Sequence, residues 1–350
     1  MATLLQMGAR WLANLEPERI IKMTFGQPIV IDGKALDPQL HLLCFVGRRL
    51  PPLNSRTPQQ ARRQFDNSTH LMRADPPKVA RIKDMEIRGP QGTIPLRILN
   101  PAPDEQGLPV LVYYHGGGFV IGGNTSHQDI LAILATEAHC IVVGVDYHLA
   151  PEFPFPAAIQ DGLAAYRWVQ THAAELGGDP GRVGVAGDSA GGNLSAVVSL
   201  MTREEHLPLP CLQALIYPAT DLAEERPSYE TFGEGFILDV HLIRWFKDNY
   251  VADAHTRLDW RASPLRAPDL TGLPVTYLST AGFDPLSDEG EAYARRLEEA
   301  GVAVTYRNFP SLTHGYIGMT GLVKTAQDAT LDLCRWLKDT FNQLPQTTWS

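Results

Sequence analysis

Short, uninterrupted apolar segments alternate with helix-length segments over most of the chain, and this alternation constrains the fold more than any other feature. Such segments, rich in Val, Ile, Leu and Tyr, suit strands buried on both faces of a parallel sheet. We expect them at 110–114, 141–146, 183–186, 215–217, 275–279 and 304–309, with helices at 126–138, 157–176, 190–202, 287–300 and 326–341. Before them, 79–88 and 93–100 predict a hairpin across Gly-Pro-Gln-Gly. The fold class is therefore α/β, a mostly parallel sheet with helices on both sides and right-handed crossovers.

Two parts of the chain interrupt this rhythm. Residues 1–75 carry apolar helical patterns at 4–15 and 40–46, followed by a polar run rich in Pro, Arg and Gln at 48–66. The first pattern predicts an amphipathic helix rather than a signal peptide, because it has no basic start and charged residues interrupt it. Residues 221–266 separate two expected strands by more than one helix requires and carry a helical pattern at 238–250. An insertion of that length in a compact domain is usually functional.

Charge and cysteine content exclude several classes of protein. The 350 residues include 30 basic and 39 acidic side chains, a net charge of −9, so the chain lacks the positive surface of a nucleic-acid binder. No apolar stretch reaches about 18 residues, so no integral membrane association is expected. The four cysteines lie far apart without a Cys-x-x-Cys pair. This pattern favours buried thiols in a reducing compartment, and hence a cytoplasmic location, over disulfides or a zinc site.

A serine lies in a glycine-rich turn between an expected strand and an expected helix. The segment Gly187-Asp-Ser189-Ala-Gly191 contains Gly-x-Ser-x-Gly directly after the strand at 183–186. In that context the chain turns sharply around a strained residue, and the flanking glycines avoid Cβ clashes. The pentapeptide alone is a weak signal, because such turns also arise by chance. With the strand and helix in place, Ser189 is the predicted nucleophile, exposed at the carboxyl end of the sheet.

A second glycine-rich segment, His115-Gly-Gly-Gly-Phe119, follows the strand at 110–114. Attack of a serine on an ester carbonyl places negative charge on the carbonyl oxygen, and preorganised backbone N–H donors stabilise that charge. Only glycines let the backbone come so close. A flexible turn or a phosphate-binding loop is the alternative, but the spacing of glycines and the lack of Gly-Lys-Ser/Thr disfavour phosphate. We therefore expect an oxyanion-binding loop here.

The base and the acid are expected downstream of the serine, in the order acid then histidine. Of the histidines after Ser189, only His314 follows the last expected strand, and histidine has the pKa needed to accept and return a proton. His206, His241 and His255 are interpreted as solvated or structural. The acid should close the preceding strand, where Asp284 stands before Pro285. Helix capping is the alternative role for Asp284.

Three other features have simpler interpretations. Asp288 and Glu289 compete with Asp284 for the role of the acid, but the first turn of a helix explains acidic residues there. Asp146, His148 and Glu152 have metal-ligand side chains, yet no second cluster supports a metal, and a rigid proline-rich loop is the preferred interpretation. We expect no metal and no cofactor. Apolar residues of the insertion form its core, and some are expected to face a substrate pocket: Phe232, Phe236, Ile237, Leu238, Leu242, Trp245 and Phe246.

Together these motifs resemble the hormone-sensitive-lipase family of α/β-hydrolases, the bacterial family IV carboxylesterases. The resemblance rests on five segments in the family's order, spread over about 200 residues: His115–Phe119, Asp146–Glu152, Gly187–Asn193, Asp284–Gly290 and His314–Tyr316. Asp188 places the chain in the Gly-Asp-Ser-Ala-Gly branch. The sequence departs from the family pattern at His148 and Ser287, where arginine is common, and neither position is part of the chemistry.

The resemblance implies an α/β-hydrolase fold with an eight-stranded sheet and a helical cap. It implies a catalytic triad of Ser189, Asp284 and His314, and oxyanion donors from the backbone N–H groups of Gly117, Gly118 and Ala190. The implied domains are an N-terminal cap segment at 1–75, a catalytic domain at 76–220 and 267–350, and an insertion at 221–266 that contributes to the cap.

The predicted function is a serine carboxylester hydrolase that acts on short- to medium-chain acyl esters through an acyl-enzyme. An amidase or deacetylase would use the same triad, and a longer-chain lipase would use it on larger substrates. A non-catalytic ligand-binding receptor is disfavoured because all three members of the triad are present. The expected partner is a small-molecule ester, with no nucleic acid, and a homodimer is anticipated.

Overall fold

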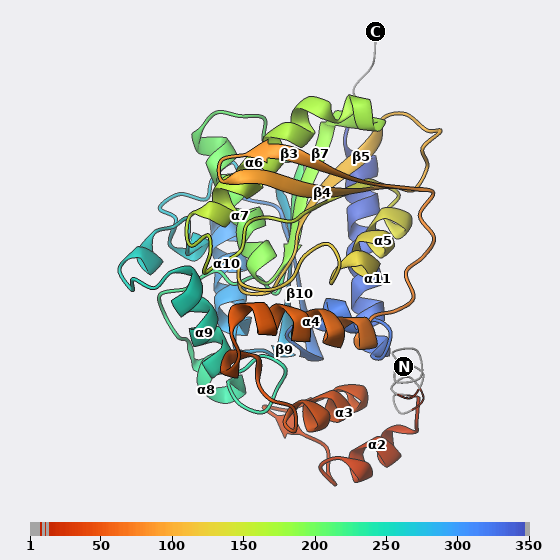
Figure 1. Ribbon diagram of the computed structural model, residues 1–350, viewed down its shortest axis with the longest axis vertical. Helices are drawn as coiled ribbons and strands as arrows, with labels where there is room; N and C mark the ends of the chain where they lie inside the picture. Colours follow the sequence, from red (N-terminus) through yellow and green to blue (C-terminus); the bar gives the residue numbers. More distant parts are fainter. Residues whose placement is uncertain (1–7, 9–10, 12–13, 347–350) are drawn as a thin grey trace.

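The computed structural model describes residues 8, 11 and 14–346, and its centre is an eight-stranded sheet (Figure 1). The strand order is β10-β9-β8-β7-β5-β6-β4-β3, parallel from β10 to β6 and antiparallel at β6-β4 and β4-β3. The strands are β3 (Arg81–Gly89), β4 (Gly92–Asn100), β5 (Leu108–Tyr114), β6 (Ile141–Val145), β7 (Gly178–Asp188), β8 (Leu212–Ile216), β9 (Val275–Phe283) and β10 (Val304–Thr313). Both the predicted α/β fold class and the hairpin β3-β4 are confirmed.

Helices cover both faces of the sheet (Figure 1). On one face lie α5 (Gln128–Glu137) and α11 (Lys324–Gln343), and on the other α6 (Ala157–His172), α7 (Ala190–Glu204) and α10 (Ser287–Glu299). Strands β5 to β9 are buried throughout or nearly so, which explains their uninterrupted apolar sequences. Among the described residues, no helix has both the length and the apolar character needed to cross a membrane.

Two separate stretches of chain lie beyond the end of the sheet at which β7 leads into α7 (Figure 1). The N-terminal stretch contains α2 (Pro17–Met23), the short strands β1 (Val30–Ile31) and β2 (Lys34–Ala35), α3 (Pro38–Gly47), η1 (Leu53–Ser55) and α4 (Pro58–Met72). The insertion contributes α8 (Pro227–Phe232), α9 (Val240–Tyr250) and the single turns η3 (Thr256–Leu258) and η4 (Pro264–Arg266). The remaining short turns are η2 (Ala174–Leu176) and η5 (Tyr316–Met319). The amphipathic helix predicted at the N-terminus falls mostly on residues outside the described part of the chain.

Helix α4 lies where the sequence shows only a polar run. Its start is nevertheless encoded locally: Thr57 Oγ1 accepts a hydrogen bond from the backbone N–H of Gln60, and Gln60 Oε1 accepts one from the N–H of Thr57. Pro58 occupies the first helical position, where its missing N–H is not needed. Arg62 then fixes the helix to the catalytic body, because its guanidinium donates to Glu152, 2.6 Å away, and to the carbonyl oxygens of Val120 and Ala150.

The cysteines are free thiols, as predicted. Cys44, Cys140 and Cys334 are buried, whereas Cys211, just before β8, is only half-buried, so the expectation of burial is wrong for that one residue.

Candidate active site

Ser189 stands alone between the end of β7 and the start of α7, with φ of +54° and ψ of −115°. A non-glycine residue in this region of backbone space costs about 1–3 kcal/mol, which the surrounding fold must supply. The turn is possible only with glycines on both sides. A Cβ on Gly187 would lie 2.4 Å from the backbone of Gly191, and one on Gly191 would lie 1.8 Å from the carbonyl oxygen of Tyr114. The predicted strand–turn–helix context of the serine is confirmed.

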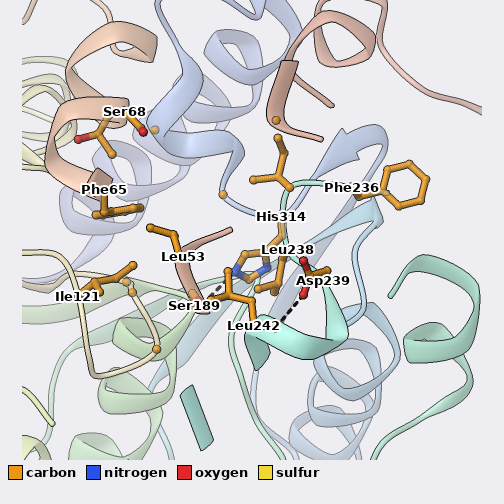
Figure 2. Close-up of a pocket in the computed structure, with 18 of the residues that line it drawn as sticks. Leu53, Phe65, Ser68, Ile121, Ser189, Phe236, Leu238, Asp239, Leu242 and His314 are labelled. Atoms are coloured by element: carbon orange, nitrogen blue, oxygen red, sulfur yellow. Dashed lines mark hydrogen bonds between the residues drawn. The ribbon is translucent and has the colours of Figure 1, made fainter. Parts of the chain in front are cut away.

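Three residues from distant parts of the chain meet at this turn. The hydroxyl oxygen of Ser189 lies 2.9 Å from Nε2 of His314, and Nδ1 of the same ring lies 2.8 Å from Oδ2 of Asp284 (Figure 2). Asp284 follows β9 and is completely buried, and its Oδ1 accepts the backbone N–H of Leu286 at 2.8 Å. That bond leaves Oδ2 directed at the imidazole. A histidine held in this way between a carboxylate and a serine can remove the proton of the serine hydroxyl.

The competing residues occupy other environments. Asp288 accepts a hydrogen bond from the N–H of Ser228, and Glu289 accepts one from the N–H of Thr220, in the first turn of α10. Three further histidines are solvent-exposed: His206, His241 and His255. The structure therefore brings Asp284 and His314, and not these alternatives, to Ser189.

The glycine-rich loop after β5 forms the wall opposite the serine. Gly117 and Gly118 have φ of +118° and +59°, in the region that favours glycine. A Cβ on Gly117 would lie 2.2 Å from the carbonyl oxygen of Ile121, and one on Gly118 would lie 2.2 Å from the ring of Phe246. Within the described chain the N–H groups of both glycines lack a hydrogen-bond acceptor. Ala190 is the first residue of α7, where helical N–H groups are also left free.

Asp188, one residue before the serine, holds this loop in place. Its Oδ1 accepts the N–H of Gly116 at 2.9 Å and the hydroxyl of Tyr113 at 2.8 Å, and the His127 ring lies 3.4 Å away. Burial alone would raise the pKa of Asp188, but the His127 imidazole and these hydrogen bonds outweigh it and hold that pKa below its usual value. In the sequence, Asp188 served only to assign a branch of the family, and its contact with the loop was not predicted. An acidic residue directly before the serine was the signal that could have indicated this contact.

His115 and His127 are buried next to each other behind the loop. Burial, and then the neighbouring His127, lower the pKa of His115 to about 3, so this ring is neutral and stacks on Tyr147 at a centroid distance of 4.3 Å. For His127 burial acts in the same direction, but the carboxylate of Asp188 outweighs it and raises the pKa above its usual value. Of the two rings, His127 is therefore the one that is more readily protonated, and it lies opposite Asp188.

Ser189 and His314 lie in a cavity of about 940 Å³ (Figure 2). Residues from α3, η1, α4 and α9 and from the loop before α9 complete its wall, and most of the side chains are apolar. Representative lining residues are Leu43, Leu53, Phe65, Met72, Ile121, Phe236, Leu238, Leu242, Phe246, Tyr250 and Met319. Of the seven apolar insertion residues, some of which were expected to face a pocket, five line this cavity: Phe236, Ile237, Leu238, Leu242 and Phe246. Leu53 and Phe65 were not expected here. Phe232 and Trp245, by contrast, are not part of this wall.

The metal interpretation of the proline-rich loop finds no support. Oδ1 of Asp146 accepts the N–H of Asn124, His148 lies against Asp161, and Glu152 pairs with Arg62. Among the residues that the structure describes, no three His, Cys, Asp or Glu side chains are grouped as a metal site would require.

Comparison with known proteins identifies the family to which this chain belongs. Residues 111–318 match the family described by the alpha/beta hydrolase fold. The chain is 40% identical to carboxylic ester hydrolase LipN of Mycobacterium tuberculosis over 305 residues, which cover 85% of this chain and 81% of LipN. It is 38% identical to an ethyl acetate hydrolase of Pseudomonas putida, over 79% of this chain and 88% of that protein. A solved ester hydrolase from the metagenome of Lake Arreo superposes with a TM-score of 0.85 and 39% identity, covering 88% of this chain and all of that one.

Proposed function

The chain is a carboxylesterase of the α/β-hydrolase fold family, in which we propose that Ser189 is the nucleophile, His314 the general base and acid, and Asp284 the residue that orients His314. The resemblance to the hormone-sensitive-lipase family is confirmed by these relatives. One observation carries the assignment of residues: the continuous contact from Asp284 through His314 to Ser189, at 2.8 and 2.9 Å, within the wall of a single cavity.

The proposed reaction has two halves. His314 takes the proton of Ser189 as its oxygen attacks the ester carbonyl, and the backbone N–H groups of Gly117, Gly118 and Ala190 stabilise the resulting oxyanion. The protonated imidazole then gives its proton to the departing alcohol, which leaves an acyl-enzyme on Ser189. Water enters, His314 removes its proton, and the collapse of the second tetrahedral intermediate releases the acid and restores the serine.

The residues at 1–75 and 221–266 are proposed to act as the cap of a catalytic domain at 76–220 and 267–350. This division is supported by the cavity wall, to which Leu53 and Phe65 contribute from the first stretch and Leu242 and Phe246 from the second. A cap that excludes water strengthens the electrostatic interactions inside the site. It would also select the acyl and alcohol groups that enter.

Short- to medium-chain esters are the proposed substrates, a choice supported by the similarity to an enzyme named for hydrolysis of ethyl acetate. A cytoplasmic location is proposed because the four cysteines are free thiols, which suit a reducing compartment. The homodimer and the absence of a nucleic-acid partner stay predictions from the sequence.

The test is hydrolysis of a p-nitrophenyl ester series from acetate to palmitate by the wild-type protein and by Ser189→Ala. We expect turnover to peak at short or medium chains and to be lost in the variant, whose fold is checked by circular dichroism. A peak at palmitate would make the protein a lipase. A fully active Ser189→Ala protein would overturn the assignment of the nucleophile, and turnover of aryl amides in preference to esters would favour the amidase.

A further inference from the structure

One face of α9 forms part of the cavity wall and is apolar except for one charged residue. Leu242, Ile243, Phe246, Lys247 and Tyr250 line the cavity, at the spacing that places helical residues on one face. Figure 2 shows Leu242 and the capping residue Asp239 on the wall of the cavity that holds Ser189. Lys247 lies in the middle of this face and is only 5% exposed. A buried ammonium on an apolar wall therefore requires an explanation.

Lys247 has no hydrogen-bond acceptor of its own within the described chain. Its Nζ lies 5.2 Å from the centroid of the Tyr229 ring, a cation–π contact with another residue of the cavity wall. No described carboxylate forms an ion pair with the ammonium. Such a contact compensates only part of the free energy lost when an ammonium leaves water.

Three acidic residues attract Lys247 electrostatically, and each of them has a closer partner. Glu225 pairs with Arg244 at 2.7 Å, and Asp221 pairs with Arg266 at 2.9 Å. Both oxygens of Glu289 are occupied by protein donors, Oε1 by backbone N–H groups and Oε2 by the hydroxyl of Tyr229. Burial also raises the pKa of Glu289 to about 8, which weakens its negative charge near neutral pH. The neighbouring cation Arg257 pairs with Asp248 at 2.8 Å.

The other charged side chains of the cavity wall are engaged differently. Asp188 is bound by the oxyanion loop, and Asp239 caps α9 through the N–H of Leu242. Arg48 donates to the carbonyl oxygen of Gly235 and lies over the ring of Phe25. Oδ2 of Asp129, in α5, has no hydrogen-bond partner among the described residues, and a carboxylate there would repel an anion. Lys247, on the α9 side, is thus the buried cation of this wall that no described acceptor engages.

We propose that Lys247 binds a carboxylate carried by the ester substrate, so that the preferred substrates are esters with a free carboxylate. A monoester of a dicarboxylic acid would carry it on the acyl side, and an ester of a hydroxy acid on the alcohol side. The inference rests on the proposed hydrolysis at Ser189. It explains why a lysine stands where an apolar residue would pack at lower cost, since an ammonium–carboxylate contact in a cavity shielded from water is stronger than one at the surface.

The test compares matched esters that differ only in charge. On the acyl side these are the mono-p-nitrophenyl ester of glutaric acid and p-nitrophenyl pentanoate, and on the alcohol side 4-acetoxybutyrate and butyl acetate. The measured quantity is the ratio of kcat/KM for the charged ester to that for the neutral one. It is determined for the wild type, Lys247→Met, Lys247→Arg and the control Lys338→Met, which removes an exposed lysine on α11.

We expect Lys247→Met to lower this ratio by about tenfold or more in one of the two pairs, since a hydrogen bond to a charged group is lost. Lys247→Arg should retain most of the preference and Lys338→Met all of it. The pair that responds identifies the side of the ester that carries the carboxylate. An unchanged ratio in both pairs for a folded Lys247→Met protein would overturn the proposal while leaving ester hydrolysis intact.

Binding separates this proposal from the catalytic one. Calorimetry measures the affinity of Ser189→Ala for glutarate monomethyl ester and 4-acetoxybutyrate, with and without Lys247→Met. Should the wild type hydrolyse no ester, the proposed function fails, but a loss of affinity in the double variant would still support the carboxylate site. Equal affinities in the two proteins would refute it.

Discussion

Asp188 Oδ1 accepts the backbone N–H of Gly116 at 2.9 Å, which joins the residue before the serine to the start of the oxyanion loop. One carboxylate thus positions the nucleophile turn and the loop that faces it. Gly117 and Gly118 of that loop have positive φ and tightly packed surroundings, so the loop needs such an anchor. We therefore propose Asp188 as a positioning residue: it contacts the loop proposed to bind the oxyanion and not the reacting atoms.

Replacing Asp188 with alanine should lower kcat more than it raises KM. The N–H of Gly116 would be left buried without an acceptor, at a cost of about 1–3 kcal/mol, or roughly ten- to a hundredfold in rate if the cost falls on the transition state. Asp188→Asn should retain most activity because its carbonyl oxygen can still accept the bond. Steady-state kinetics on one p-nitrophenyl ester check this, with Tyr113→Phe as a control that removes a different donor to Asp188. Equal effects of Asp188→Ala on kcat and KM would argue against loop positioning.

Gly118→Ala should reduce kcat by on the order of 10²–10³, the usual effect of losing an oxyanion donor. The added methyl would lie 2.2 Å from the ring of Phe246, and φ of +59° is unfavourable for alanine. Gly272→Ala is the matched control, because its φ of +71° imposes similar strain while no atom lies within 4 Å of the added methyl. The control should lose some thermal stability and retain kcat. Comparable kcat losses in both variants would point to strain rather than to the oxyanion.

Asp284→Asn should lower kcat by on the order of 10⁴, because the amide cannot stabilise the imidazolium and favours the wrong tautomer of His314. Asp288→Asn, four residues along, is the control. It accepts a hydrogen bond from the N–H of Ser228 and should leave kcat near that of the wild type. Single-turnover measurements on both proteins distinguish them. A larger loss in Asp288→Asn than in Asp284→Asn would contradict the assignment of the acid.

Glu289 predicts a pH dependence of stability. Burial raises its pKa from the usual 4.5 to about 8, opposed in part by Lys247 and backbone N–H groups and assisted by Asp221. A raised carboxyl pKa means that the folded state holds a proton that the unfolded state has released. Stability from this group is therefore full below about pH 4.5 and is lost as the pH rises through about 8. The melting temperature of Glu289→Gln should therefore fall less than that of the wild type as the pH rises between these limits. Equal falls in the two proteins would show that Glu289 does not titrate in this range.

The sequence predicted the parts of the site that local patterns encode. The serine turn follows from glycines between a strand and a helix, and the candidates Asp284 and His314 follow from their positions directly after β9 and β10. The helices of the proposed cap were harder to predict because they are short or polar: α4 is recognisable mainly from the Thr57–Gln60 capping box. The roles of Asp188 and Lys247 depend on what lies opposite them in space, which a single sequence does not encode.

The central claim is that Ser189 is the activated nucleophile, and covalent labelling tests it most directly. The wild-type protein is treated with diisopropyl fluorophosphate, its intact mass is measured, and the modified peptide is sequenced by tandem mass spectrometry. We expect one adduct per chain, on Ser189, with labelling abolished in Ser189→Ala and strongly slowed in His314→Gln. An adduct on another serine, or continued ester hydrolysis by a protein that takes up no label, would contradict this account.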